Sequence, residues 1–516
     1  MKRNRFKQVL LSLFCLIVLF GLIACGNGNS GGKSQAERSS AGTKIKDQVI
    51  IATPLDVTTT DPQGSNTDAN MMLYALTHET LVELDPATGN VKPGLAEFQV
   101  IDGYTFKFTL PANATFTNGT PCTANDVKFT YERAKVSPKG FTTPKMVLVS
   151  SIEVLNDREL ILKISQPSQE FLMTLAHRSL SILSEKELAA RGDEGSDMGT
   201  GMYKLERWIP GDYISVVRYE GYRGGPAKTK RIELRLMKED SARVIALQTG
   251  EIDVCINPPS VELDYIAKDP NLELIQIPNV IMLYLAFNNT KAPLNNPAVR
   301  RALAHAVNKQ ALIIAGYNGL GTPHNNMINI GQFGLDETIK GYDFNLDKAK
   351  SLLAEAGYPN GITFELAYDG SAKALMAQVL QSDFAKIGVT LDLQEMENAA
   401  LKSMLNEKKH TSALYQWTDV DGTDFTVRSM YYTGSGSNRS LIADPALDKM
   451  IDEALVQSDV QKRAQMYRDI DRYVTEACPI VPICTSILSI GVRKGLGGVV
   501  WMGTAKHDYR GIYAME

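Results

Sequence analysis

The sequence of 516 residues predicts an α/β fold, which the C-terminal half of the chain indicates most clearly. Residues 361–393 contain a strand-like, a helix-like and a second strand-like segment joined by short turns, the pattern of a βαβ unit with parallel strands. Residues 80–165 are richer in strand-like segments. At roughly 150 residues per domain the length corresponds to about three folding units, and 44% hydrophobic with 22% charged residues is an ordinary globular composition.

Two hairpins and a helix start are expected in the β-rich part. The first hairpin covers 98–110 with a turn at Asp102-Gly103, and its second arm alternates so that one face is buried. That face comprises Tyr104, Phe106, Phe108 and Leu110. A capping box from Thr123 to Asp126 predicts a helix start, and a second hairpin is expected around Asn156-Asp157.

Three helices are expected further along the chain. Apolar residues at i, i+3, i+4, i+7 and i+8 predict one helix over 297–316. A shorter stripe of apolar residues predicts a second helix over 349–356, which ends at Gly357. The helix of the βαβ unit is expected over 372–387.

Composition and charge exclude several classes of protein. Lys and Arg number 54 against 58 Asp and Glu, a net charge of −4, so a broad basic surface for nucleic acid is not expected. Six cysteines and six histidines are few for a disulfide scaffold or a metal store. Since no metal, phosphate-loop or dinucleotide motif occurs in the sequence, we expect no metal and no cofactor.

Residues 1–24 are typical of a lipoprotein signal peptide. Four basic residues precede the uncharged run 9–24, which at 16 residues is shorter than the roughly 20 that a spanning helix needs. The run ends in Leu22-Ile23-Ala24-Cys25, which resembles the bacterial lipobox, so Cys25 is the expected lipidation site. The alternative is an uncleaved anchor, and in both cases the body lies outside the cytoplasmic membrane. Residues 25–45 are rich in Gly and Ser and are expected to form a flexible tether.

Five segments together resemble the extracytoplasmic solute-binding proteins of peptide/nickel-type ABC importers, family 5. The most specific is Phe108–Ala134, with a strand, then F-x-[ND]-G-x-P-x-T-A-x-D-V, then a helix. In the segment that resembles GTGPY…W.PG, Met202 replaces the usual Pro. The five segments are 108–134, 199–212, 243–254, 285–309 and 438–455, in the family's order.

The resemblance implies the two-lobed type II periplasmic-binding-protein fold with an extra subdomain in the first lobe. We name the expected parts the lobe I core (46–77, 196–282 and 487–516), the extra subdomain (78–195) and lobe II (283–486). The chain would cross between lobes near 282 and 487. Ligand would bind between the lobes and contact both, because only a ligand with differential affinity for the closed state can close them.

The segment 416–425 is the first candidate for ligand contact, as an acidic loop with aromatic residues. A carboxylate there could pair with a peptide ammonium, and a Trp supplies an apolar wall. In the family an aspartate after this Trp takes the peptide amine, but that place is Val420 here, and the ending resembles the G-D-A-D-Y form of glutathione-type members. The candidates are Trp417, Asp419, Asp421, Asp424 and Phe425, and the alternative is a solvated acidic loop.

Further candidates lie elsewhere. Thr59, Thr60 and Asp61 end the first expected strand, where a plain turn is the alternative. Arg178 and Arg439 could each bind a ligand carboxylate through two parallel hydrogen bonds, or could be surface residues exposed to solvent.

Two other residue types bear on metals and disulfides. His410 could ligate a chelated metal, although a surface histidine explains it more simply. Cys478 and Cys484 are expected to be buried thiols, with a disulfide possible if the strand folds back.

The sequence therefore predicts a monomeric solute-binding protein that delivers short peptides to an ABC permease and ATPase complex. It is expected at the outer face of the cytoplasmic membrane, held by its lipid anchor and catalysing nothing. Alternatives within the fold are a binder of nickel chelates, of glutathione-like solutes or of other small solutes. Outside it, an extracellular hydrolase is less expected, because no strand–turn–helix context presents a nucleophile, and a sensor or chaperone is a third possibility.

Overall fold

The computed structural model describes residues 44–85, 90–137, 142–168, 170–330, 332–418, 422–502 and 507–516. Residues 44–516 form one compact unit, to which the described helices and strands all belong. The expected signal peptide, Cys25, Asp419 and Asp421 lie outside the described residues.

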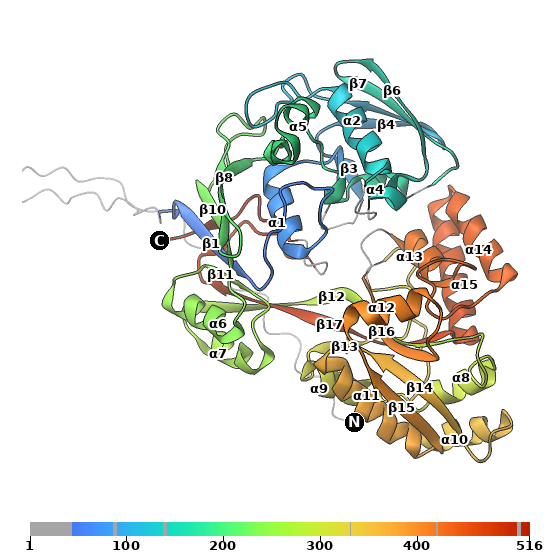
Figure 1. The fold of residues 1–516 in the computed structure, drawn as a ribbon. Coiled ribbons are helices and arrows are strands. Elements are labelled where there is room, and N and C mark those ends of the chain that lie inside the picture. Colours follow the sequence, from blue (N-terminus) through green and yellow to red (C-terminus); the bar gives the residue numbers. More distant parts are fainter. Residues whose placement is uncertain are drawn as a thin grey trace, which may run out of the picture. The chain divides into compact units, whose positions relative to one another are not determined.

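One sheet of eleven strands runs through this unit (Figure 1). Its path is β15 (Val389–Glu395), β14 (Ile362–Tyr368), β16 (Ser412–Thr418), β12 (Leu272–Phe287), β17 (Ile480–Arg493), β11 (Val254–Ile256), β1 (Gln48–Thr53), β10 (Arg231–Leu236), β9 (Tyr213–Arg218) and β8 (Tyr203–Ile209), while β13 (Gly321–Pro323) pairs with β17. β14 and β15 are parallel and are joined through α11 (Ser371–Ala385), which confirms the predicted βαβ unit.

β12 and β17 are the long strands on which the predicted lobes meet. They pair antiparallel from Leu272↔Arg493 to Pro278↔Ile487 and, after a register shift, from Met282↔Thr485 onward. The last residues of β17 also pair with β11 on the other side. The expected crossing points near 282 and 487 fall at this shift, and the lobe boundaries stay a prediction.

The buried apolar side chains form separate clusters that follow the three expected parts. Two clusters lie in the lobe I core, one lies in the extra subdomain, and three lie in lobe II apart from Met282. Since burial of apolar surface is the main favourable term in folding, each part has a core of its own.

The extra subdomain contains a four-stranded antiparallel sheet in the order β4 (Glu97–Asp102), β5 (Thr105–Thr109), β7 (Glu159–Ile164) and β6 (Val149–Asn156). Both predicted hairpins are therefore confirmed. So is the capping box, in which Thr123 and Asp126 open α2 (Ala124–Lys135). The prediction for Tyr104 was wrong: it is 49% exposed because it lies in the turn rather than on the strand.

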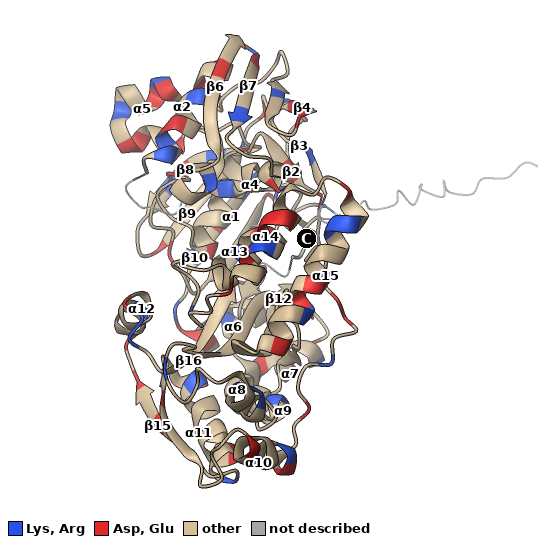
Figure 2. Cartoon of the chain, turned by 90° about the vertical axis from the view of Figure 1, so that its right-hand side faces the viewer, with Lys and Arg blue, Asp and Glu red and all other residues tan. Residues whose placement is uncertain are grey.

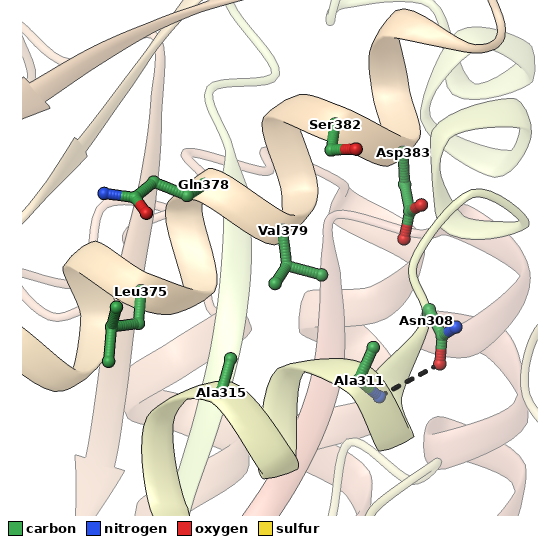
Figure 3. A pocket seen from close by; sticks show the side chains of 8 residues that line it. All are labelled: Asn308, Ala311, Ala315, Leu375, Gln378, Val379, Ser382 and Asp383. Carbon is green, nitrogen blue, oxygen red and sulfur yellow. Dashed lines mark hydrogen bonds between the residues drawn. The ribbon is translucent and has the colours of Figure 1, made fainter.

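The helix predicted over 297–316 is two helices, α8 (Pro297–Ala304) and α9 (Lys309–Tyr317). Asn308 starts the second: its side-chain oxygen accepts a hydrogen bond from the Ala311 main-chain nitrogen at 3.1 Å (Figure 3). Asparagine is a strong N-cap residue, so a new helix begins although the apolar stripe continues.

The remaining elements complete the described fold. The helices are α1 (Asp68–Thr77), α3 (Thr143–Met146), α4 (Phe171–Leu175), α5 (Glu185–Arg191), α6 (Asp240–Thr249), α7 (Leu263–Lys268), α10 (Leu346–Glu355), α12 (Asn398–Asn406), α13 (Thr423–Tyr431), α14 (Pro445–Val456) and α15 (Val460–Ala477), and the short strands are β2 (Val82–Leu84), β3 (Val91–Pro93), β18 (Leu496–Gly497) and β19 (Tyr513–Ala514). α10 confirms the helix that was predicted over 349–356 and expected to end at Gly357. Among the described residues no helix has the length and apolar character to cross a membrane. Cys478 and Cys484 are both buried and free.

Charged residues of both signs are interspersed over the described elements. Figure 2 shows Lys and Arg next to Asp and Glu on many helices and strands. Many of them form ion pairs with each other, as Arg231 does with Glu206 at 2.6 Å.

Candidate functional site

The predicted acidic loop is shorter than expected. β16 ends at Thr418, and α13 begins at Thr423 after the N-cap Gly422, so only residues 419–422 lie between strand and helix. Trp417 therefore lies on the strand, and Asp424 and Phe425 lie in the first turn of the helix.

Trp417 and Phe425 form an apolar wall at this strand-to-helix junction. Their ring centroids are 6.2 Å apart with an interplanar angle of 30°. The Trp417 indole Nε1 donates a hydrogen bond to Thr426 Oγ1 at 3.1 Å, which fixes the ring. Phe425 keeps 37% of its surface exposed, so a face of this aromatic pair remains available for an apolar group.

The Asp424 carboxylate is directed into lobe II. It is 7% exposed, and its Oδ1 accepts a hydrogen bond from the Tyr467 hydroxyl of α15 at 3.2 Å. Its Oδ2 lies 3.6 Å from Arg428 Nε. Burial raises the pKa of Asp424, and the nearby Arg428 charge opposes that rise. Asp424 thus has partners within its own lobe.

The main chain of Asp424 contacts the extra subdomain instead. Its N–H donates a hydrogen bond to Glu170 Oε2 at 3.0 Å, and Glu170 is 8% exposed. Nearby, Lys145 Nζ lies 5.8 Å from the Phe425 ring centroid. Lobe II and the extra subdomain therefore meet at the start of α13, through two residues that were not among the predicted candidates. No local sequence motif distinguishes Glu170 or Lys145. Their contacts with Asp424 and Phe425, which are far away in the sequence, are what join the two parts of the chain.

A cavity of about 260 Å³ lies beside α4, between the extra subdomain and the lobe I core. Met173 of α4 and Ala176, which follows α4, line it together with Arg178 and with charged residues of the C-terminal segment. Glu170 at the start of α4 contacts α13, so one short helix borders both the cavity and the contact with lobe II.

Arg178 lies in the wall of this cavity. Its guanidinium donates to the main-chain oxygens of Met71 at 3.1 Å and His507 at 3.3 Å. Burial lowers the pKa of Arg178 to about 10, which leaves it protonated at neutral pH. Close by, Arg510 pairs with both Glu83 and Asp508. The cavity is accordingly lined by fixed charges of both signs.

Thr59, Thr60 and Asp61 lie where the lobe I core meets the extra subdomain. β1 ends at Thr53, earlier than expected. Thr60 Oγ1 lies 2.8 Å from Ser196 Oγ, and the Asp61 carboxylate accepts two hydrogen bonds from Arg133, at 2.6 and 3.2 Å. These side chains have partners within the protein, and their contact with a ligand stays a prediction.

Arg439 and His410 lie together in lobe II. Arg439 donates to Asn406 Oδ1 at 2.9 Å and to the Gly436 main-chain oxygen at 3.0 Å. The ring of His410 is bound to the Arg439 main-chain oxygen at 2.7 Å. The surface position expected for His410 was wrong, since the residue is 1% exposed. Within the described ranges no group of three or more His, Cys, Asp or Glu residues could hold a metal ion.

An open groove of about 360 Å³ lies elsewhere in lobe II, between α9 and α11 (Figure 3). Ala311 and Ala315 line it from α9, and Leu375 and Val379 from α11. None of the candidate ligand residues lines this groove.

The comparison with protein families decides what kind of protein this is. The profile for the bacterial extracellular solute-binding proteins, family 5 (middle region), matches residues 90–439. The chain belongs to this family. The resemblance seen in the sequence is thereby confirmed.

Relatives and solved structures of family 5 match nearly the whole chain. The dipeptide-binding protein of Escherichia coli K12 is 27% identical over 475 residues, covering 84% of this chain and 88% of the relative. The glutathione-binding protein GsiB of Salmonella typhimurium is 26% identical over 468 residues, covering 87% and 91%. The structure of HbpA2 from Haemophilus parasuis has a TM-score of 0.81 at 26% identity, covering 91% of this chain and all of that one. The predicted α/β periplasmic-binding-protein fold is confirmed.

Proposed function

We propose that this family 5 protein captures short peptides between its lobes and delivers them to the permease and ATPase of an ABC importer. The observation that carries the proposal is the meeting of lobe II and the extra subdomain at α13, next to the Trp417–Phe425 pair. A solute held there contacts both lobes, as closure requires. A dipeptide-binding relative matches this chain over 475 residues, and this similarity supports a peptide as the solute.

The two ends of a peptide would meet different groups. Asp419 and Asp421, beside Trp417 in the sequence, would receive the ammonium group, and the Trp417–Phe425 pair would cover an apolar side chain. Arg178, in the cavity bordered by α4, would face the carboxylate. In this proposal the protein binds and releases its solute unchanged.

Native mass spectrometry of the purified protein tests this proposal. We expect a co-purified peptide, and isothermal titration of the solute-stripped protein should then give a Kd in the micromolar range or below for that peptide. Incubation with the same peptide should leave it intact by mass. Failure of a broad dipeptide and tripeptide panel to bind would overturn the peptide proposal, and sustained cleavage would favour a hydrolase.

A glutathione-like solute is the second candidate. Asp424-Phe425 resembles the end of the G-D-A-D-Y form of glutathione-type members, and GsiB is among the relatives. Glutathione carries an ammonium and two carboxylates, which suits a site with charges of both signs. Titration of glutathione against dipeptides on the same protein separates the two, since the true solute must displace the other.

A further inference from the structure

The hydrogen bond between Glu170 and α13 joins the extra subdomain to lobe II by groups of the chain itself. Its two residues are 254 positions apart in sequence and both are buried. N–H groups in the first turn of a helix have no acceptor within that helix. The Glu170 carboxylate supplies an acceptor to one of them, the N–H of Asp424.

Two features favour this carboxylate at this position, and a further contact joins the same two parts of the chain. The positive end of the nine-residue helix α13 attracts a negative charge. Gly422 makes room for it, because a Cβ at residue 422 would clash with the Glu170 carboxylate. The Lys145 ammonium over the Phe425 ring adds a second contact between the same two parts.

We propose that Glu170 and the first turn of α13 form a latch that favours the closed arrangement of the lobes. This inference rests on the proposed function, in which the lobes open and close around a solute. Because the latch belongs to the protein, it lowers the free energy of closing for every solute alike. A solute then supplies only the remainder of the closing free energy.

The latch predicts an effect that a ligand-contacting residue would not produce. Removal of Glu170 should weaken the binding of chemically different solutes by the same factor, since each loses the same closing contribution. A residue that touches the solute would instead discriminate between solutes. This difference separates a latch from a further ligand contact.

Hydrogen exchange of the Asp424 amide in the solute-stripped mature protein tests the latch directly. We expect this amide to exchange about tenfold faster in Glu170→Ala than in the wild type, equivalent to about 1.4 kcal/mol. Small-angle scattering should show a larger radius of gyration for the variant. The exposed residue Glu153 of β6, in the same subdomain, provides the control Glu153→Gln, which should match the wild type.

The Glu170→Ala variant should keep its fold. The main-chain oxygen of Glu170 accepts from Thr174 N at 3.0 Å, and the substitution leaves that bond in place. Circular dichroism before the exchange experiment checks this.

Two results would overturn the latch. One is an Asp424 amide that exchanges equally fast in the wild type and in Glu170→Ala. The other is a peptide affinity that is the same in both proteins, which would leave the proposed function intact. A protected wild-type amide in a protein that binds none of the solutes would uphold the contact and overturn the proposed function instead.

Discussion

Gly422 shows how one residue links the chemistry of the chain to the contact between its lobes. Its φ of +105° lies in the region that favours glycine, and its missing side chain leaves room for the Glu170 carboxylate. The residue therefore meets two requirements at once, the turn into α13 and the approach of the extra subdomain.

Replacement of this glycine should disturb both. We expect Gly422→Ala to lower the free energy of unfolding by about 1–2 kcal/mol through backbone strain, and to enlarge the solute-stripped protein in small-angle scattering. Gly434→Ala is the matched control, with a φ of +81° and nothing near its Cβ position, so it should show the strain alone. Equal scattering for both variants would contradict the role given to Gly422.

The three aspartates of the 419–424 segment differ in what they can offer a ligand. Asp424 has Tyr467 and Arg428 as partners within lobe II, whereas Asp419 and Asp421 lie outside the described residues. All three were candidates from the sequence, which did not distinguish them. Helix α13 begins only one residue before Asp424, and no sequence pattern showed that Asp424 lies on a helix while Asp419 and Asp421 precede it.

Replacement of all three by alanine should weaken binding of the co-purified solute more than tenfold, a loss of about 1.4 kcal/mol measured by titration calorimetry. Asp424→Asn alone should have a smaller effect, because its carboxylate is turned toward Tyr467. An unchanged affinity in the triple variant would remove this segment from the site.

At the scale of elements, short sequence patterns were sufficient to predict helices and strands whose contacting residues are close in the sequence. The capping box of α2, the two hairpins and the βαβ unit were all predicted. The break between α8 and α9 was missed because the apolar stripe continues through it while Asn308 starts a new helix. The contact of α4 with α13 was beyond prediction, since no local signal records a partner 254 residues away.

The expected signal peptide and tether, residues 1–45, lead to a prediction at the same scale. We propose that Cys25 carries the lipid, so Cys25→Ser should release the protein from membranes while its solute affinity stays unchanged. Fractionation of cells followed by immunoblotting measures the first, and calorimetry measures the second. Continued membrane attachment of the variant would show that the apolar run 9–24 is itself the anchor.

At the scale of the whole molecule, buried histidines link stability to pH. Burial lowers the pKa of His78, His324 and His507 to about 4 each, against about 6.5 in an unfolded chain. Between these values the unfolded state binds more protons, so stability is present above pH 6.5 and is lost as the pH falls toward 4. Asp471 acts in the opposite direction: burial raises its pKa to about 6, so between about pH 4 and 6 it favours the folded state at the lower pH.

The three histidines should outweigh the one aspartate. At pH 5 each histidine contributes about 0.9 proton taken up on unfolding and Asp471 about 0.8 proton released, a net of about two protons. In urea unfolding these four groups together should lower the free energy of unfolding by roughly 2–3 kcal/mol for each pH unit that the pH falls near pH 5. His324→Gln should make this slope shallower and Asp471→Asn should make it steeper, each by about 1 kcal/mol per pH unit. The slope is the readout, because each substitution also changes the stability at neutral pH by breaking hydrogen bonds, such as that of Asp471 with the Met327 N–H. Parallel pH profiles for the wild type and both variants would show that these buried groups do not control the acid stability of the protein.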